Sequence, residues 1–384
     1  MTFLHNSMKS SAIERLALVI FLTIGALASE SANPSLAMNL EQQGKFAEAA
    51  EVWRQITKAD PNDAGAFASL GVDLSRQAKY SEAASAYKKA LALNPKLPGI
   101  ELNLGLAEFK GGRFASAIAP LKTALKSDPS SVQARTLLGM SCYGSKRFAE
   151  AIAYLEPLVD SQPENIELRQ TLAQSCMAAR NYSCATEQFQ KILQQNPDSA
   201  AAHILTGEAL DGLQRTNEAI AEFQEALKIS PREPEIRFGL GYLYWKSHRY
   251  GEAKKEFEAE LSISPAHAQS LAYLGDIELK SGHLETAAPL LEKSIQQNSD
   301  VRIAYLDLGE IRAQQKQYPE AIKAYAHAAE LDPTQPDAHF RLAQMYQKSG
   351  QAEKAKTEFA KTRELHQKSD AAVVIRLGEP HSPP

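Results

Sequence analysis

The sequence lacks the short motifs that mark the common catalytic centres. It contains no glycine loop of the Walker type, no H-E-x-x-H and no G-x-S-x-G. Its nine histidines are dispersed along the chain. The three cysteines, Cys142, Cys176 and Cys184, do not have the spacing of a zinc site. We therefore predict no catalytic, cofactor-binding or metal-binding residues, and a binding protein in place of an enzyme.

The sequence also lacks an excess of positive charge. It has 42 Lys and Arg residues against 46 Asp and Glu residues, so the net charge is −4. A nucleic-acid-binding surface needs a basic stripe, and we therefore predict no nucleic-acid partner. Only 7% of the residues are aromatic although 44% are hydrophobic, a balance that suits a stack of alanine-rich helices.

No long hydrophobic run is present. The apolar segment from Leu16 to Ala28 has 13 residues, which is short for a membrane span. Lys9 and Arg15 precede it, and its end reads Ala-Leu-Ala before Ser29, which is the layout of a signal peptide. We predict a signal peptide at residues 1–28, cleaved after Ala28, and a periplasmic or secreted protein. The alternative is an uncleaved segment that anchors the chain to a membrane, which is the only membrane contact expected.

Proline recurs in the sequence with a period of 34 residues, and this regularity indicates a repeated structural unit. The prolines concerned are Pro61, Pro95, Pro129, Pro163, Pro197, Pro231, Pro265 and Pro333. Ser299 occupies the one place in this series that lacks proline. If each repeat starts three residues after its proline, ten repeats fill residues 30–369, with boundaries near 64, 98, 132, 166, 200, 234, 268, 302 and 336.

Three positions of the repeat define its geometry. Position 8 is always Gly or Ala, position 20 is always Ala, and position 24 is always bulky. The bulky residues and the small ones fall on the inward faces of two amphipathic helices, A and B, which pack closely because the small residues let their backbones approach. Glycine is frequent at position 15, where it marks a turn between the helices, and the proline ends helix B.

This pattern resembles the tetratricopeptide repeat, a 34-residue helix–turn–helix unit. The seventh repeat shows it most fully, with Leu240-Gly241-x2-Tyr244, then Ala253-x3-Phe257, then Pro265. The resemblance implies an all-α fold, a right-handed superhelical solenoid of tandem repeats. It also implies a scaffold or adaptor that binds a protein or peptide in the concave groove lined by the A helices. Residues 370–384 fall beyond the last repeat, and we predict a largely disordered tail there.

The variable positions of the A helices hold the candidate partner-binding residues. Phe238, Tyr242 and Trp245 are spaced to share one helix face. The full candidate set is Phe238, Tyr242, Trp245, Tyr273, Asp276, Glu208, Asp307 and Glu310. Aromatic residues beside unpaired acids indicate a partner peptide with apolar and basic residues. The alternative is that these aromatic residues only pack and that the acids only solvate a surface.

Three further points concern the partner, the cysteines and the function. Some relatives hold a chain-terminal carboxylate with a clamp of Lys, Asn and Arg, but here only Asn103 matches that clamp. A disulfide between Cys176 and Cys184 would need an oxidising compartment. An alternative function to a general adaptor is an accessory or assembly protein of an envelope machinery for secretion, pilus formation or polysaccharide export.

Overall fold

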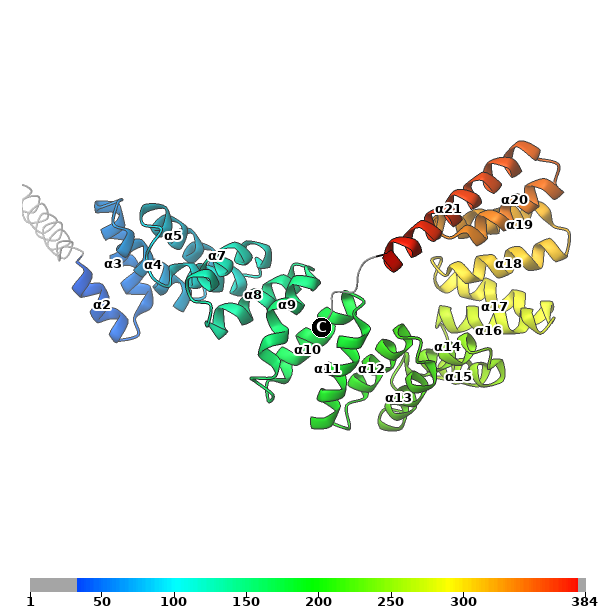
Figure 1. Ribbon diagram of the computed structural model, residues 1–384, viewed down its shortest axis with the longest axis horizontal. Coiled ribbons are helices and arrows are strands. Elements are labelled where there is room, and N and C mark those ends of the chain that lie inside the picture. Colours follow the sequence, from blue (N-terminus) through cyan, green and yellow to red (C-terminus); the bar gives the residue numbers. More distant parts are fainter. Residues whose placement is uncertain (1–32, 379–384) are drawn as a thin grey trace, which may run out of the picture. The chain divides into compact units, whose positions relative to one another are not determined.

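The computed structural model describes residues 33–378, and within this range it contains α-helices and no strand. The chain divides into two compact units, with the boundary between Asn181 and Tyr182. In both units the even-numbered helices are the A helices of the repeats and the odd-numbered helices are the B helices. Figure 1 shows the helices of each unit following one another in chain order. The all-α repeat fold predicted from the sequence is confirmed.

The first unit contains the helices of the first four repeats and the A helix of the fifth. They are α2 (Pro34–Gln42), α3 (Phe46–Ala59), α4 (Ala64–Arg76), α5 (Tyr80–Leu93), α6 (Ile100–Lys110), α7 (Phe114–Ser127), α8 (Val132–Gly144), α9 (Phe148–Val159) and α10 (Ile166–Ala178). Each helix packs on the next, and the A helices α4, α6, α8 and α10 also contact one another in sequence.

The second unit begins with a B helix and continues to the end of the described chain. Its helices are α11 (Tyr182–Gln195), α12 (Ala200–Gly212), α13 (Thr216–Ile229), α14 (Ile236–Lys246), α15 (Tyr250–Ile263), α16 (Ala268–Lys280), α17 (Leu284–Gln297), α18 (Arg302–Gln314), α19 (Tyr318–Leu331), α20 (Pro336–Lys348) and α21 (Ala352–Gly378). The A helices α14, α16 and α18 contact one another in sequence.

The core of each repeat is built around the small residues at positions 8 and 20. Ala253 and Ala287 at position 20 have no exposed surface, and Phe257 at position 24 is also fully buried. A β-carbon added at Gly241 would lie 2.8 Å from the ring of Phe257. Glycine at position 8 therefore provides the space that the bulky residue at position 24 fills, because a β-carbon at that distance would overlap the ring.

Side-chain hydrogen bonds mark the start of several A helices and the end of several B helices. Asp63 caps α4 by accepting a hydrogen bond from the Ala66 amide at 2.9 Å. After several B helices, Asp or Asn accepts from the amide two residues later; the distance is 3.0 Å from Ser130 to Asp128. Asn298 makes the same turn before Asp300, at 2.9 Å. The eighth repeat thus keeps its turn although Ser299 replaces the proline.

The turn between helices A and B requires a residue with positive φ at position 15. Five glycines have positive φ in the described chain, and four of them, Gly44, Gly112, Gly282 and Gly350, stand at this position. In the other six repeats a residue with a side chain adopts the same conformation: Ala78, Lys146, Arg180, Gln214, His248 and Lys316. The repeated packing holds these residues in a conformation that costs a non-glycine residue roughly 1–2 kcal/mol.

The chain ends differ from the sequence predictions in one respect. Helix α21 continues to Gly378, so residues 370–378 extend the last B helix where a disordered tail was predicted. The sequence from Ala352 contains no proline or glycine before Gly378 that could end the helix earlier. The predicted signal peptide and the final residues 379–384 lie outside the described residues.

The cysteines differ in their surroundings. Cys142 is buried in the apolar core of the first unit with a free thiol, and burial raises the pKa of this thiol. Cys176 is also buried. Cys176 and Cys184 belong to different units, and a bond between them stays a prediction.

Candidate functional site

The A-helix face of the second unit carries a cluster of aromatic side chains, here called the aromatic cluster. It consists of Phe238, Tyr242 and Trp245 on α14 and Tyr273 on α16. The ring centroids of Tyr273 and Trp245 are 4.8 Å apart, and those of Tyr273 and Tyr242 are 5.6 Å apart. Phe238 lies 6.0 Å from Tyr273. The structure therefore brings together the four aromatic residues that the sequence singled out, at distances typical of aromatic pairs.

The aromatic cluster is anchored by a buried acid. The indole Nε1 of Trp245 donates a hydrogen bond of 2.5 Å to Asp276, which is only 3% exposed. Lys280 forms an ion pair with the same carboxylate, and its ammonium lies 5.2 Å from the Trp245 ring centroid. Burial, with smaller contributions from Tyr242, Asp276 and Asp307, raises the pKa of Tyr273 to about 12. The Tyr273 hydroxyl is therefore protonated at neutral pH.

Two of the acids on this face, Asp276 and Glu310, already form ion pairs, which the sequence did not predict. Glu310 pairs with Arg341, and Asp276 is already paired with Lys280. Asp307 is 9% exposed, and its Oδ2 has no hydrogen-bond partner. Burial and the nearby Asp276 raise the pKa of Asp307 well above its usual value. The interpretation of Asp276 and Glu310 as unpaired acids is thus wrong, because basic residues of the same face reach them.

A pocket of about 310 Å³ opens next to the aromatic cluster, between α12, α13 and α14; it is here called the acidic pocket. Its lining residues are Ile204, Glu208, Asp211, Phe223, Glu235, Phe238, Gly239, Tyr242 and Leu243. Of the predicted site residues, Phe238, Tyr242 and Glu208 line the pocket. The pocket is not lined by Trp245 and Tyr273, which lie beside it in the aromatic cluster, or by Asp276, which anchors that cluster. It is also not lined by Asp307 and Glu310.

The three carboxylates of the acidic pocket differ in their partners. Asp211 pairs with Lys246 at 2.8 Å, and Glu235 lies 3.1 Å from His267. Glu208 makes no hydrogen bond or ion pair through its side chain with any described residue. Glu208 is exposed to solvent, but the surrounding helices partly desolvate its carboxylate and so raise the pKa of this group. Glu208 is therefore the carboxylate of this pocket that a basic ligand group would neutralise most favourably.

Glu235 has an unusual backbone conformation at the mouth of the acidic pocket. Its φ is +74°, and within residues 33–378 it is the one non-glycine residue with positive φ outside the position-15 turns. Gly99 has the same conformation at the corresponding place before α6, where glycine adopts it without strain. The Glu235 amide donates a weak bond of 3.4 Å to the buried Glu260. Strained backbone of this kind is found more often at binding sites than elsewhere.

Two of these pocket residues, Asp211 and Glu235, are not among the predicted site residues. Asp211 stands at repeat position 12 and Glu235 at repeat position 2, directly after Pro234. The one hint lay in the comparison of Pro234-Glu235 with Pro98-Gly99. A glutamate in a place that suits glycine indicates a side chain that is needed there.

Within residues 33–378, no three His, Cys, Asp or Glu side chains are placed to hold a metal ion. None of the helices α2–α21 combines the length and apolar character that crossing a bilayer requires.

Comparison with known families identifies the repeat. A tetratricopeptide repeat model matches residues 35–99, 102–166 and 238–300, which together are about half of the chain. The chain belongs to the tetratricopeptide repeat family. Related models of the same repeat match residues 143–210, 212–247, 309–350 and 337–369. The family resemblance inferred from the sequence is confirmed, and this fold is typical of protein–protein interaction.

Solved structures with the same fold include two with TM-scores of 0.51. One is the APC/C hetero-tetramer Cut9-Hcn1, 14% identical, where the match covers 86% of this chain and 79% of the other. The second is a tetratricopeptide repeat protein from Parabacteroides merdae, 18% identical, with 64% of this chain and 97% of the other covered. At these identities the likeness concerns the fold alone. No curated protein matches the chain.

Proposed function

We propose that this tetratricopeptide repeat protein is a non-enzymatic scaffold that binds a partner protein through the A-helix face of its second unit. The observation that carries the proposal is the acidic pocket beside the aromatic cluster. Half-buried aromatic side chains next to a concave, partly apolar pocket are the usual anchors of a protein interface.

The chemistry of the pocket favours a peptide segment that carries an apolar residue and a nearby Lys or Arg. Ile204, Phe223 and Leu243 supply apolar surface for the first. The free carboxylate of Glu208 would pair with the Lys or Arg. Burial raises the pKa of Glu208, and a cation bound nearby would return this pKa toward its ordinary value. This matches the partner class expected from the sequence, with Glu208 in place of the paired acids as the charged contact.

A matched pair of charge variants tests this proposal. Fluorescence polarisation would measure the binding of short labelled peptides that alternate Leu and Lys, with a Leu and Gln series for comparison. Glu208→Gln should weaken binding of the basic peptide by about tenfold, the effect of losing one partly desolvated ion pair. Glu258→Gln, on the exposed side of α15, removes the same charge and should change affinity less than twofold.

The aromatic cluster is tested separately, because Phe238 also packs on Phe257 with ring centroids 6.0 Å apart. Tyr242→Ala and Phe238→Ala should both weaken binding of the Leu and Lys peptide, and circular dichroism would verify that the helices remain folded. Equal affinities for wild type, Glu208→Gln and Tyr242→Ala would reject the site.

The location of the scaffold is part of the proposal. The signal-like N-terminus supports export to the periplasm or secretion after cleavage behind Ala28. A protein in that compartment could serve as an accessory of an envelope assembly, which is the alternative use of the same scaffold. Mass spectrometry of the protein from its native source should show a chain that starts at Ser29; an intact residue 1–28 segment would favour the membrane-anchored alternative.

A further inference from the structure

The A-helix face of the first unit has a pocket of its own, here called the basic pocket. It has a volume of about 450 Å³ and lies between α4, α5 and α6. Its lining residues are Val72, Ser75, Arg76, Tyr80, Tyr87, Asn103, Leu106, Ala107 and Lys110. No acidic residue is among them, in contrast to the acidic pocket of the second unit.

The two cations of the basic pocket have no acidic partner. Arg76 and Lys110 are exposed, and neither makes an ion pair or a side-chain hydrogen bond with a described residue. The Arg76 guanidinium lies 5.9 Å from the centroid of the Phe46 ring. The side-chain amide of Asn103 likewise has no hydrogen-bond partner in the described chain. The pocket therefore presents donors and positive charge without a carboxylate of its own.

The second unit shows what these cations do when an acid is present. Lys246 stands at the same repeat position as Lys110, and it pairs at 2.8 Å with Asp211, which precedes it by 35 residues. The residue 35 places before Lys110 is Ser75. Lys280, at the same position again, pairs with Asp276 four residues earlier, whereas Leu106 stands four residues before Lys110. The first unit thus keeps the basic residues and lacks their carboxylates.

Charge at a helix end alone does not account for this difference. Lys and Arg in the last turn of an A helix offset the helix dipole in both units. That role needs no pocket, yet here the two basic residues border an open space of about 450 Å³. The hydroxyls of Ser75 and Tyr87, 3.4 Å apart, are further polar groups at this space.

We propose that the basic pocket binds the side-chain carboxylate of an acidic segment in a partner protein, which takes the place that Asp211 occupies beside Lys246. Arg76 and Lys110 supply the charge, and Asn103 donates hydrogen bonds. Val72 and Leu106 contact an apolar residue next to the acid. The site is independent of the acidic pocket, so the protein carries two recognition sites of opposite charge, one on each unit.

The experiment uses the full mature chain and a labelled peptide of alternating Glu and Leu, with both ends blocked so that it has no terminal carboxylate. Fluorescence polarisation should show binding that a Gln and Leu peptide does not reproduce. Arg76→Gln/Lys110→Gln should weaken binding at least tenfold, since two charged contacts are lost. The control, Lys58→Gln/Lys126→Gln, removes two exposed charges from the B helices α3 and α7 and should change affinity less than twofold.

A third variant introduces a carboxylate into the basic pocket itself. Ser75→Asp should pair with Lys110 as Asp211 pairs with Lys246, and it should weaken the Glu and Leu peptide about tenfold without loss of folding. Three outcomes would overturn the proposal. These are equal weakening by the control, binding seen only when the peptide has a free C-terminal carboxylate, and equal competition by a single-stranded oligonucleotide. The Glu208→Gln variant should leave this binding unchanged, which separates a failure here from a failure at the acidic pocket.

Discussion

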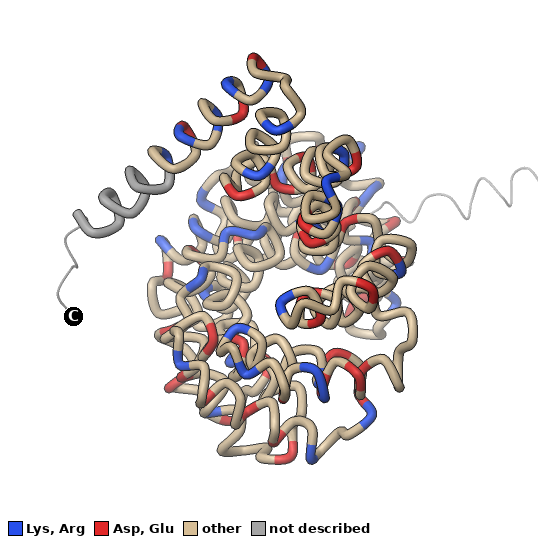
Figure 2. The backbone as a smooth tube through the Cα atoms, turned by 90° about the vertical axis from the view of Figure 1, so that its right-hand side faces the viewer, with Lys and Arg blue, Asp and Glu red and all other residues tan. Residues whose placement is uncertain are grey.

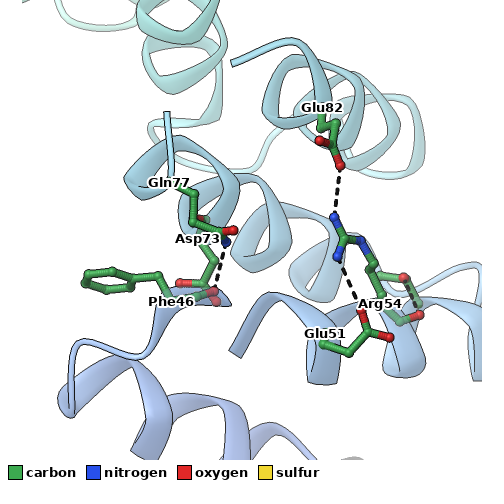
Figure 3. A network of polar contacts seen from close by, with 7 residues as sticks. Phe46, Glu51, Arg54, Asp73, Gln77 and Glu82 are labelled. Carbon is green, nitrogen blue, oxygen red and sulfur yellow. Dashed lines mark hydrogen bonds and ion pairs between the residues drawn. The ribbon is translucent and has the colours of Figure 1, made fainter. Parts of the chain in front are cut away.

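Replacement of Asp73 by Asn should remove a strong pH dependence from the stability of the first unit. Asp73 lies in α4 with no exposed surface, and both of its carboxylate oxygens lack hydrogen-bond partners. Figure 3 shows the neighbouring Gln77, whose amide could have served as a donor. That amide instead donates to the carbonyl oxygen of Phe46 at 2.9 Å and to the backbone oxygen of Asp73 at 3.1 Å. The carboxylate is therefore buried without compensation.

The magnitude follows from the pKa. Burial first, and the negative charge of Glu41 second, raise the pKa of Asp73 from 3.8 to about 7. The folded state therefore binds a proton that the unfolded state releases between these values. The contribution to stability is fully present below pH 3.8 and is lost as pH rises through about 7. A shift of this size corresponds to about 4 kcal/mol in the free energy of unfolding, an upper limit because water can reach the site by local opening.

The assay uses the two tryptophans of the chain. Trp53 is buried in α3 of the first unit and Trp245 lies in the second. In a Trp245→Phe background, urea unfolding followed by Trp53 fluorescence reports the first unit alone. In the protein that retains Asp73, the urea concentration at the unfolding midpoint should decrease as the pH is raised from 5 to 8. With Asp73→Asn it should stay nearly constant over this range, so that the variant gains on the parent as pH rises. Parallel pH profiles for the two proteins would refute the argument.

Three further predictions concern backbone and packing. Gly241→Ala should lower the free energy of unfolding by about 1–3 kcal/mol, because its β-carbon meets the Phe257 ring at 2.8 Å. Gly251→Ala, where nothing lies within 4 Å, should leave it unchanged or raise it by about 0.5 kcal/mol in the same thermal unfolding assay. Glu235→Gly should relieve the positive φ and raise thermal stability by about 1 kcal/mol; a loss of stability would show that the Glu235 side chain holds the turn.

Much of the fold could be predicted because each repeat position has one structural task. Gly241, Ala253 and Phe257 form a contact whose residue types leave little choice of geometry. The boundary between Asn181 and Tyr182 could not be predicted, since the 34-residue period continues across it without a change. The positive φ of residues such as Lys146 could not be predicted either, because tertiary packing there overrides the local backbone preference of a residue with a side chain.

The candidate site was predictable in its aromatic part and at Glu208, but not in its ion pairs. The spacing of Phe238, Tyr242 and Trp245 on one helix places them together whatever surrounds them. Ion pairs such as Lys280–Asp276 and Lys246–Asp211 depend on where long flexible side chains end, which a sequence pattern does not fix. Figure 2 shows acidic and basic residues interspersed along the helices, so that charge counts alone could not locate the basic pocket or the acidic one.

The most direct test of the scaffold account is site-specific photocrosslinking in the native compartment. A benzoylphenylalanine residue would replace Tyr242 at the acidic pocket or Glu258 on the exposed side of α15. The account predicts a covalent adduct with a partner protein from position 242 and none from position 258. Adducts of equal yield from both positions, or an adduct from position 258 alone, would contradict binding through the A-helix face.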